Sequence, residues 1–157
     1  MTFAALFMAV GVLSAHLVYI PVGIAKCFPV QHAINILTAV LLGTRYSVTT
    51  AFGTSLLRNM LGTGSLLAFP GSIFGAALSG ILYKKTNHIM GAVIGEIIGT
   101  GILGGLFAFP VANYVIGTPV GALFFVWPFL ISTLGGCVLA FLIYHSPVTA
   151  FARDRLH

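Results

Sequence analysis

Residues 120–144 read VGALFFVWPFLISTLGGCVLAFLIY and contain no charged side chain. A helix needs roughly 20 apolar residues to cross the hydrocarbon core of a bilayer, so this stretch predicts a membrane span. The whole 157-residue chain has the same character, because 59% of its residues are hydrophobic and only 6% are charged. A soluble domain carries about 25% charged residues. We therefore expect an all-α membrane protein with a single transmembrane domain over residues 1–157.

Shorter apolar segments precede this stretch and predict further helices. They cover residues 2–20, 30–42, 47–60, 70–83 and 88–107. Between them we expect a loop bounded by Pro21 and Pro29, a turn after Gly43, a loop over 61–69, a polar break over 84–87 and a connection over 108–119. With the last segment, this pattern predicts a six-transmembrane-helix bundle whose two termini lie on the same side.

The basic residues predict the orientation of this bundle. Most of them fall on the side of the termini, which the positive-inside rule assigns to the cytoplasm. These residues are Arg45, Lys84, Lys85, Arg153 and Arg155. Lys26 and Arg58 then lie at the outer face, against the rule, and require another explanation.

Polar residues follow one face of the second predicted helix and one face of the third. Their spacing is four and three on the second helix and four and four on the third, so each set shares a face. The residues are Gln31, Asn35 and Thr38, bordered by His32, and Thr50, Thr54 and Arg58, adjoined by Asn59. They predict a polar-lined cavity inside the bundle. The alternative is hydrogen bonding between helices, which is the favoured interpretation for the threonines alone.

Three further residues are candidates for ligand contact. Glu96 is an ionisable group within a predicted span, which is a functional hypothesis by default. Its structural alternative is an ion pair with Arg58 or Lys26, or a protonated carboxyl bonded to a neighbouring helix. Lys26 lies in a loop shaped by two prolines, which favours a loop that caps a pocket. The alternative interpretation is that its side chain only extends to the membrane interface. Trp127 is favoured as an interfacial anchor, and stacking on a planar ligand is its second interpretation.

Small residues recur every four positions and allow close helix packing. The pairs are Ala5 with Ala9, Gly11 with Ala15, Gly71 with Gly75, and the series Gly91, Gly95 and Gly99. Most of these residues are expected to pack inside the bundle. A smooth face on the first helix also suits the docking of another membrane protein.

Several function classes find no support in the chain. The net charge of +5 comes without a basic run that interleaves aromatic residues, which argues against nucleic-acid binding. No nucleotide-binding loop, metal cluster or nucleophile–base pair has recognisable spacing, so no cofactor and no metal are expected. Two rival classes remain open. One is an intramembrane enzyme that uses Glu96 with His32, and the other is a structural protein that assembles through its small residues.

Three stretches resemble the ThiW family. They are residues 21–35 (PVGIAKCFPVQHAIN), 55–71 (SLLRNMLGTGSLLAFPG) and 95–104 (GEIIGTGILG), and the resemblance extends over essentially the whole chain. Proteins of this family are regarded as substrate-binding S components of energy-coupling factor (ECF) transporters, a type of ABC importer. The resemblance implies a six-helix fold with cytoplasmic termini in the prokaryotic inner or plasma membrane. It also implies that Ala5 and Ala9 match an Ala-x-x-x-Ala pattern that contacts the scaffold subunit.

The implied partners are one transmembrane scaffold subunit and two ATPase subunits, so the energy for transport comes from other chains. The implied ligand is the thiazole precursor of thiamine, either hydroxyethylthiazole or a carboxylated or phosphorylated relative. The alternative in the same class is an S component for another small heterocyclic vitamin precursor. We expect binding by the outer halves of the second, third, fifth and sixth helices, capped by the loops around Lys26 and Thr63. The candidate binding residues are Lys26, Gln31, His32, Asn35, Thr54, Arg58, Asn59, Glu96 and Trp127.

Overall fold

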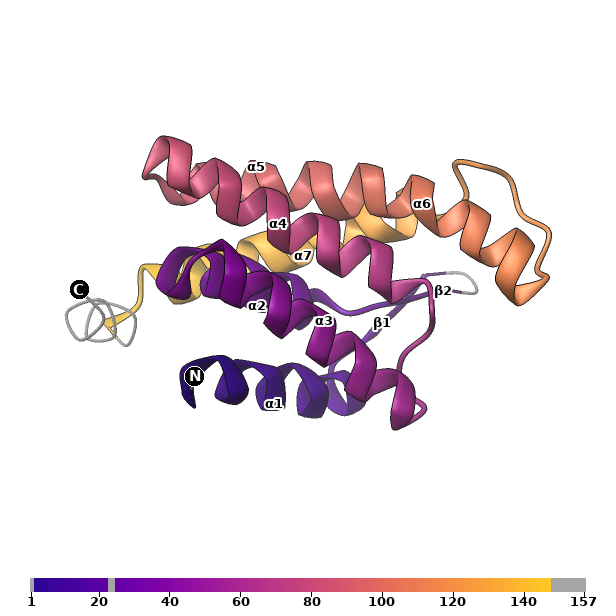
Figure 1. The fold of residues 1–157 in the computed structure, drawn as a ribbon, viewed down its shortest axis with the longest axis horizontal. Helices are drawn as coiled ribbons and strands as arrows, with labels where there is room; N and C mark the ends of the chain where they lie inside the picture. Colours follow the sequence, from indigo (N-terminus) through magenta and orange to yellow (C-terminus); the bar gives the residue numbers. More distant parts are fainter. Residues whose placement is uncertain (1, 23–24, 148–157) are drawn as a thin grey trace.

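Helices dominate the computed structural model, which describes residues 2–22 and 25–147. The elements are α1 Thr2–Leu17, β1 Ile20–Val22, β2 Ala25–Cys27, α2 Pro29–Leu42, α3 Thr44–Met60, α4 Ala68–Thr86, α5 Ile89–Glu96, the π-helix η1 Ile97–Gly104, α6 Gly105–Pro110, the π-helix η2 Val111–Ile116 and α7 Val126–Tyr144. The helices run along the long axis of the molecule, and α1 begins at the same end at which α7 stops (Figure 1). Arg153 and Arg155 lie outside the described residues.

Within the described residues, two helices are long and apolar enough to cross a membrane, Ile89–Ile116 and Val126–Tyr144. The helices Thr2–Leu17 and Pro29–Leu42 are apolar but shorter. The expectation of an all-α membrane protein therefore agrees with the structure, whereas a bundle of six spans is not established by helix length.

The expected helix boundaries hold to within a few residues in the first half of the chain and fail around Pro110. We expected the fifth helix to end at Phe107, but helical structure continues to Ile116. Proline lacks an N–H and usually ends a helix. Here Pro110 is the last residue of α6 and the wider turns of η2 follow it directly. The segment ends at Gly117, whose φ of 76° is the left-handed geometry that favours glycine.

The loop expected between Pro21 and Pro29 contains a short antiparallel hairpin. Strand β1 pairs with β2, with Pro21 opposite Lys26 and Ile20 opposite Cys27. The Cys27 thiol donates to the carbonyl of Pro128 over 3.2 Å, and the backbone N–H of Phe28 donates to Ser132 Oγ over 2.8 Å. These bonds hold the hairpin and the start of α2 against α7.

Helix α2 occupies the centre of the bundle, since nearly all of its residues are buried. Its apolar residues Ala33, Ile36, Leu37 and Val40 form one core cluster with residues of α5 and α7. Small residues bring α4 and η1 together, because a Cβ added at Gly99 would lie 2.7 Å from Gly75 Cα.

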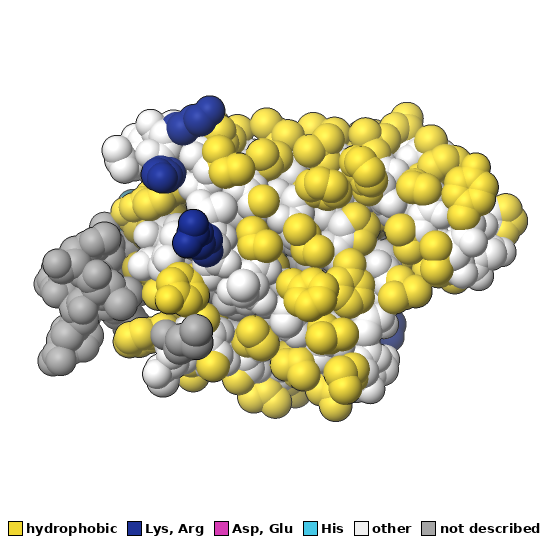
Figure 2. All heavy atoms as spheres, in the orientation of Figure 1, with side chains coloured by type: hydrophobic (Ala, Val, Ile, Leu, Met, Phe, Trp, Pro, Cys, Tyr) yellow, Lys and Arg dark blue, Asp and Glu magenta, His cyan; other side chains and the backbone are white. Residues whose placement is uncertain are grey.

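The distribution of polarity is the reverse of that in a soluble protein. Arg58, Glu96 and Asn35 are among the most deeply buried side chains, whereas Leu17 is 83% exposed and Leu13 is 65% exposed. Figure 2 shows hydrophobic side chains over most of one face, with most of the visible Lys and Arg toward the end where α1 begins. Large exposed apolar surfaces face lipid or other proteins rather than water. This surface agrees with a location in the membrane.

Candidate ligand-binding site

A cavity of about 400 Å³ opens at the end of the bundle opposite the start of α1. The hairpin, the first turn of α2, the last turn of α3, the loop after α3 and the first turns of α4 and α7 surround it. Its lining includes Lys26, Phe28, Gln31, His32, Arg58, Thr63, Gly71, Ser72, Thr100, Phe125, Phe129 and Ser132. Aromatic rings thus lie beside a small number of polar groups, a composition typical of small-molecule sites.

Arg58 is fully buried at the end of α3 and lines this cavity. Its guanidinium donates to the side-chain carbonyl of Gln31 and, over 3.1 Å, to the backbone carbonyl of Thr63. The guanidinium carbon lies 3.7 Å from the centre of the Phe28 ring, which is a cation–π contact. The Nε atom has no hydrogen-bond partner among the described residues.

Gln31 connects Arg58 to two serines on neighbouring helices. Its Nε2 donates to Ser55 Oγ over 3.0 Å, and Ser55 Oγ lies 2.8 Å from Ser72 Oγ. This chain of hydrogen bonds joins α2, α3 and α4 at the cavity, since Gln31 and Ser72 both line it. It fixes the orientation of the Gln31 amide, since the carbonyl oxygen faces Arg58.

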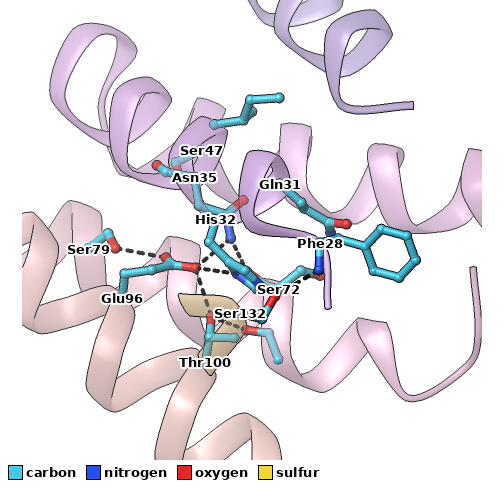
Figure 3. Close-up of polar contacts among 12 residues, drawn as sticks. Phe28, Gln31, His32, Asn35, Ser47, Ser72, Ser79, Glu96, Thr100 and Ser132 are labelled. Carbon is cyan, nitrogen blue, oxygen red and sulfur yellow. Dashed lines mark hydrogen bonds and ion pairs between the residues drawn. The ribbon is translucent and has the colours of Figure 1, made fainter. Parts of the chain in front are cut away.

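Glu96 lies deeper in the bundle and is fully buried. Its Oε1 contacts His32 Nδ1 at 3.0 Å, Asn35 Nδ2 at 3.0 Å and Thr100 Oγ1 at 2.8 Å, and its Oε2 contacts Ser79 Oγ at 3.0 Å. Figure 3 shows these contacts converging on the carboxylate from several helices. The alternative of an ion pair with Arg58 or Lys26 is wrong, because the basic side chain that contacts Glu96 in the described part of the chain is that of His32.

His32 connects this network to the cavity. Its ring lines the cavity, while Nδ1 is engaged by Glu96. Which ring nitrogen of a histidine carries the proton depends on the bond that the other nitrogen makes. The Glu96 contact therefore determines whether the other ring nitrogen of His32 donates or accepts a hydrogen bond toward a ligand in the cavity.

Lys26 is exposed at the mouth of the same cavity. Its ammonium lies 5.1 Å from the centre of the Tyr19 ring. It thus adds a second positive charge to a cavity that already contains Arg58.

The remaining candidates lie outside the cavity lining. Thr54 is buried against α1, where a Cβ at Gly11 would lie 2.9 Å from its Cγ2. Asn59 donates to the carbonyls of Ser55 and Ser65. Asn35 contacts Glu96 from beneath the cavity. Trp127 is 71% exposed and does not line the cavity, so its stacking on a ligand there is not supported.

Sequence reasoning missed Phe28, Ser72, Thr100 and Ser132 as cavity residues. Phe28 directly precedes Pro29 at the start of α2, and this position was its only local signal. The other three are small polar residues in apolar helices. They carry no spacing pattern that distinguishes them from residues that pack helices together.

The two small-residue pairs of α1 face different ways. Ala5 and Ala9 are exposed, whereas Gly11 and Ala15 are buried against the bundle. Only the first pair is therefore free in the described structure to contact another protein.

Comparison with known proteins identifies the family. No curated protein and no solved structure matches the chain. A family model described as thiamine-precursor transporter protein (ThiW) matches residues 1–147, a range that contains every residue of the cavity. A transporter component is not an enzyme, so the alternative of an intramembrane enzyme using Glu96 and His32 is wrong. The chain belongs to the ThiW family of thiamine-precursor transporter proteins and is located in the membrane.

Proposed function

We propose that this protein is the substrate-binding S component of an ECF-type ABC importer and that it takes up the thiazole precursor of thiamine. The cavity at the end of the bundle away from Arg45, Lys84 and Lys85 carries this proposal. The protein binds the precursor from outside and hands it inward. It belongs in the prokaryotic plasma membrane as a single multi-pass domain.

The proposed topology has six spans, with Ile89–Ile116 counted as one. The short helix α2 rises about 1.5 Å per residue and falls short of the ~30 Å hydrocarbon core. It does not need to face lipid along its length, because the other helices surround it. The exposed Arg45 lies at the start of α3, and the exposed Lys84 and Lys85 lie in the last turn of α4. These element ends are at the side of the bundle where α1 begins and α7 stops, and the positive-inside rule makes this side cytoplasmic. The cavity then opens outward.

The cavity suits a small heterocycle. Its volume of about 400 Å³ lies within the roughly 300–1,000 Å³ range of small-molecule sites. Phe28, Phe125 and Phe129 provide rings for contact with a planar ligand, while His32 and Ser132 provide polar partners. The ligand is bound without covalent chemistry.

The proposed partners are a transmembrane scaffold subunit and two ATPase subunits. The exposed face of α1 with Ala5 and Ala9 is the proposed contact with the scaffold. In this proposal the ATPase subunits supply the energy for transport.

Binding measurements on the purified protein test this function. The protein is titrated with hydroxyethylthiazole, with its carboxylated and phosphorylated relatives, with the pyrimidine precursor of thiamine and with thiamine itself. Any ligand that co-purifies with the protein is identified by mass spectrometry. We expect at least one thiazole to bind more tightly than the pyrimidine or thiamine. Ser132→Ala, in the cavity, should weaken binding, whereas Ser146→Ala, near the opposite end, should not. Binding of a different heterocycle and of no thiazole would favour an S component with another substrate.

A further inference from the structure

The cavity contains a buried positive charge that no acidic residue of the described chain neutralises. Arg58 is 1% exposed, and its partners are the Gln31 amide, the Thr63 carbonyl and the Phe28 ring. All three are uncharged. A guanidinium stays protonated in proteins, so Arg58 cannot avoid the cost of burial by losing its proton. A buried charge is normally paired, because an unpaired one is costly.

The chain offers no carboxylate for this pairing within the described residues. The sequence contains two acidic residues, Glu96 and Asp154, and Asp154 lies outside the described residues. Glu96 is occupied by His32, Asn35, Thr100 and Ser79. It is not within ion-pair distance of Arg58.

The guanidinium also has donor capacity left over. It carries five N–H groups, and its bonds to Gln31 and Thr63 use one hydrogen each. The buried Nε has no partner among the described residues. Gln31 and Thr63 therefore hold the planar group in a fixed orientation and leave other donors unused.

Lys26 gives the same cavity a second positive charge at its mouth. A neutral ligand gains little from these two charges, since amide, hydroxyl and ring contacts are enough to bind it. An anionic group gains a charge-assisted bond to an oriented planar fork, which is the geometry that arginine offers to carboxylate and phosphate oxygens.

We infer that the ligand enters this cavity with an anionic group, a carboxylate or a phosphate, which Arg58 binds and Lys26 attracts at the mouth. This inference rests on the proposed function and specifies the charge of its substrate. The anionic group lies toward Arg58, and the aromatic part of the ligand lies toward Phe125 and Phe129.

The decisive experiment compares ligands that share one thiazole ring. Wild-type protein is titrated with neutral hydroxyethylthiazole, its phosphate ester, a thiazole carboxylate and the carboxamide of that carboxylate. We expect one anionic ligand to bind at least about tenfold more tightly than its neutral counterpart, since a bond to a charged group contributes more than a neutral one. The two anionic ligands distinguish carboxylate from phosphate recognition.

Arg58→Gln should remove this preference, and Lys26→Gln should reduce it and weaken its dependence on salt. Arg45→Gln, an exposed basic residue at the opposite end, is the matched control and should leave the preference unchanged. Equal or tighter binding of the neutral ligands to wild-type protein would overturn the inference, whether or not Arg58→Gln folds. In that case the thiazole function would stand. If no thiazole binds, the proposed function itself has failed.

Discussion

The Nδ1 atom of His32 on α2 lies 3.0 Å from Oε1 of Glu96 on α5, in the buried centre of the bundle. Three further side chains from α2, α4 and η1 contact the same carboxylate, so one acidic residue joins four elements. Because His32 also lines the cavity, this pair connects the ligand site to the packing of the helices. It is the first place where a substitution should affect stability and binding together.

Replacing Glu96 should show what this junction contributes. Glu96→Ala removes the acceptor of several buried groups and should lower the free energy of unfolding by about 3–5 kcal/mol. Glu96→Gln keeps a carbonyl oxygen and nearly the same volume, and should cost about 1–2 kcal/mol. Thermal unfolding of the two variants in the same detergent measures the difference. Equal losses would mean that the negative charge of the carboxylate matters and that the volume and the carbonyl oxygen of the side chain do not.

Gly75 should tolerate no side chain. A Cβ at this position would lie 2.0 Å from Thr100 Oγ1 and 2.8 Å from both carboxylate oxygens of Glu96. Gly75→Ala should therefore lower stability by about 1–3 kcal/mol through overpacking. Gly121→Ala is the control, because nothing lies within 4 Å of an added Cβ there. A Gly75→Ala protein with wild-type melting temperature would contradict the close packing of α4 on the end of α5 and on η1.

Local signals explain which parts of this arrangement were predictable. Apolar runs interrupted at Gly43 and after Met60 predicted the helices that carry Gln31 and Arg58. The predicted bounds of these helices are close to those in the structure. The continuation through Pro110 was missed, because a proline normally ends a helix and π-turns have no simple sequence signal.

Contacts between distant residues were less predictable. His32 and Glu96 are 64 positions apart, and Arg58 was considered as the partner of Glu96 on charge alone. The real partner is a histidine, whose charge depends on its surroundings. The grouping of Gln31, His32 and Arg58 at one end did follow from helix periodicity and from the orientation of the chain.

The exposed small residues of α1 should matter for transport and not for ligand binding. Ala5→Leu combined with Ala9→Leu should leave ligand affinity unchanged and abolish uptake, because added bulk prevents close approach of the proposed scaffold helix. Uptake by cells and co-purification with the scaffold and ATPase subunits are the two measurements. The buried Ala15→Leu is the contrasting variant and should lower thermal stability instead. Normal co-purification of the double variant would argue against this docking face.

The proposed orientation is testable by cysteine labelling of intact cells. Cys27 and Cys137 are buried, so they should give little background. A cysteine at the exposed position Gly121, near the cavity end, should react with a membrane-impermeant reagent, and a cysteine at Lys85 should react only after the membrane is permeabilised. Labelling of position 85 and protection of position 121 would invert the topology and place the cavity opening in the cytoplasm.

Ligand binding should depend on Phe28 and not on Trp127. Phe28 lines the cavity and lies under the Arg58 guanidinium at 3.7 Å, whereas the Trp127 side chain is 71% exposed on the outside of α7. Phe28→Leu keeps an apolar side chain but removes the ring that packs on the Arg58 guanidinium. Loss of this cation–π contact should weaken binding of the tightest thiazole by roughly two- to thirtyfold, because the ring helps to hold the group that binds the ligand. Trp127→Leu should leave that affinity within about twofold, because loss of an exposed interfacial ring removes no contact in the cavity. Titration of both variants with the same ligand decides between the two residues.

Since Trp127 is the single tryptophan of the chain, ligand addition should also change the intrinsic tryptophan fluorescence little. Loss of binding in Trp127→Leu together with normal binding in Phe28→Leu would move the ligand from this cavity to the outer surface of α7.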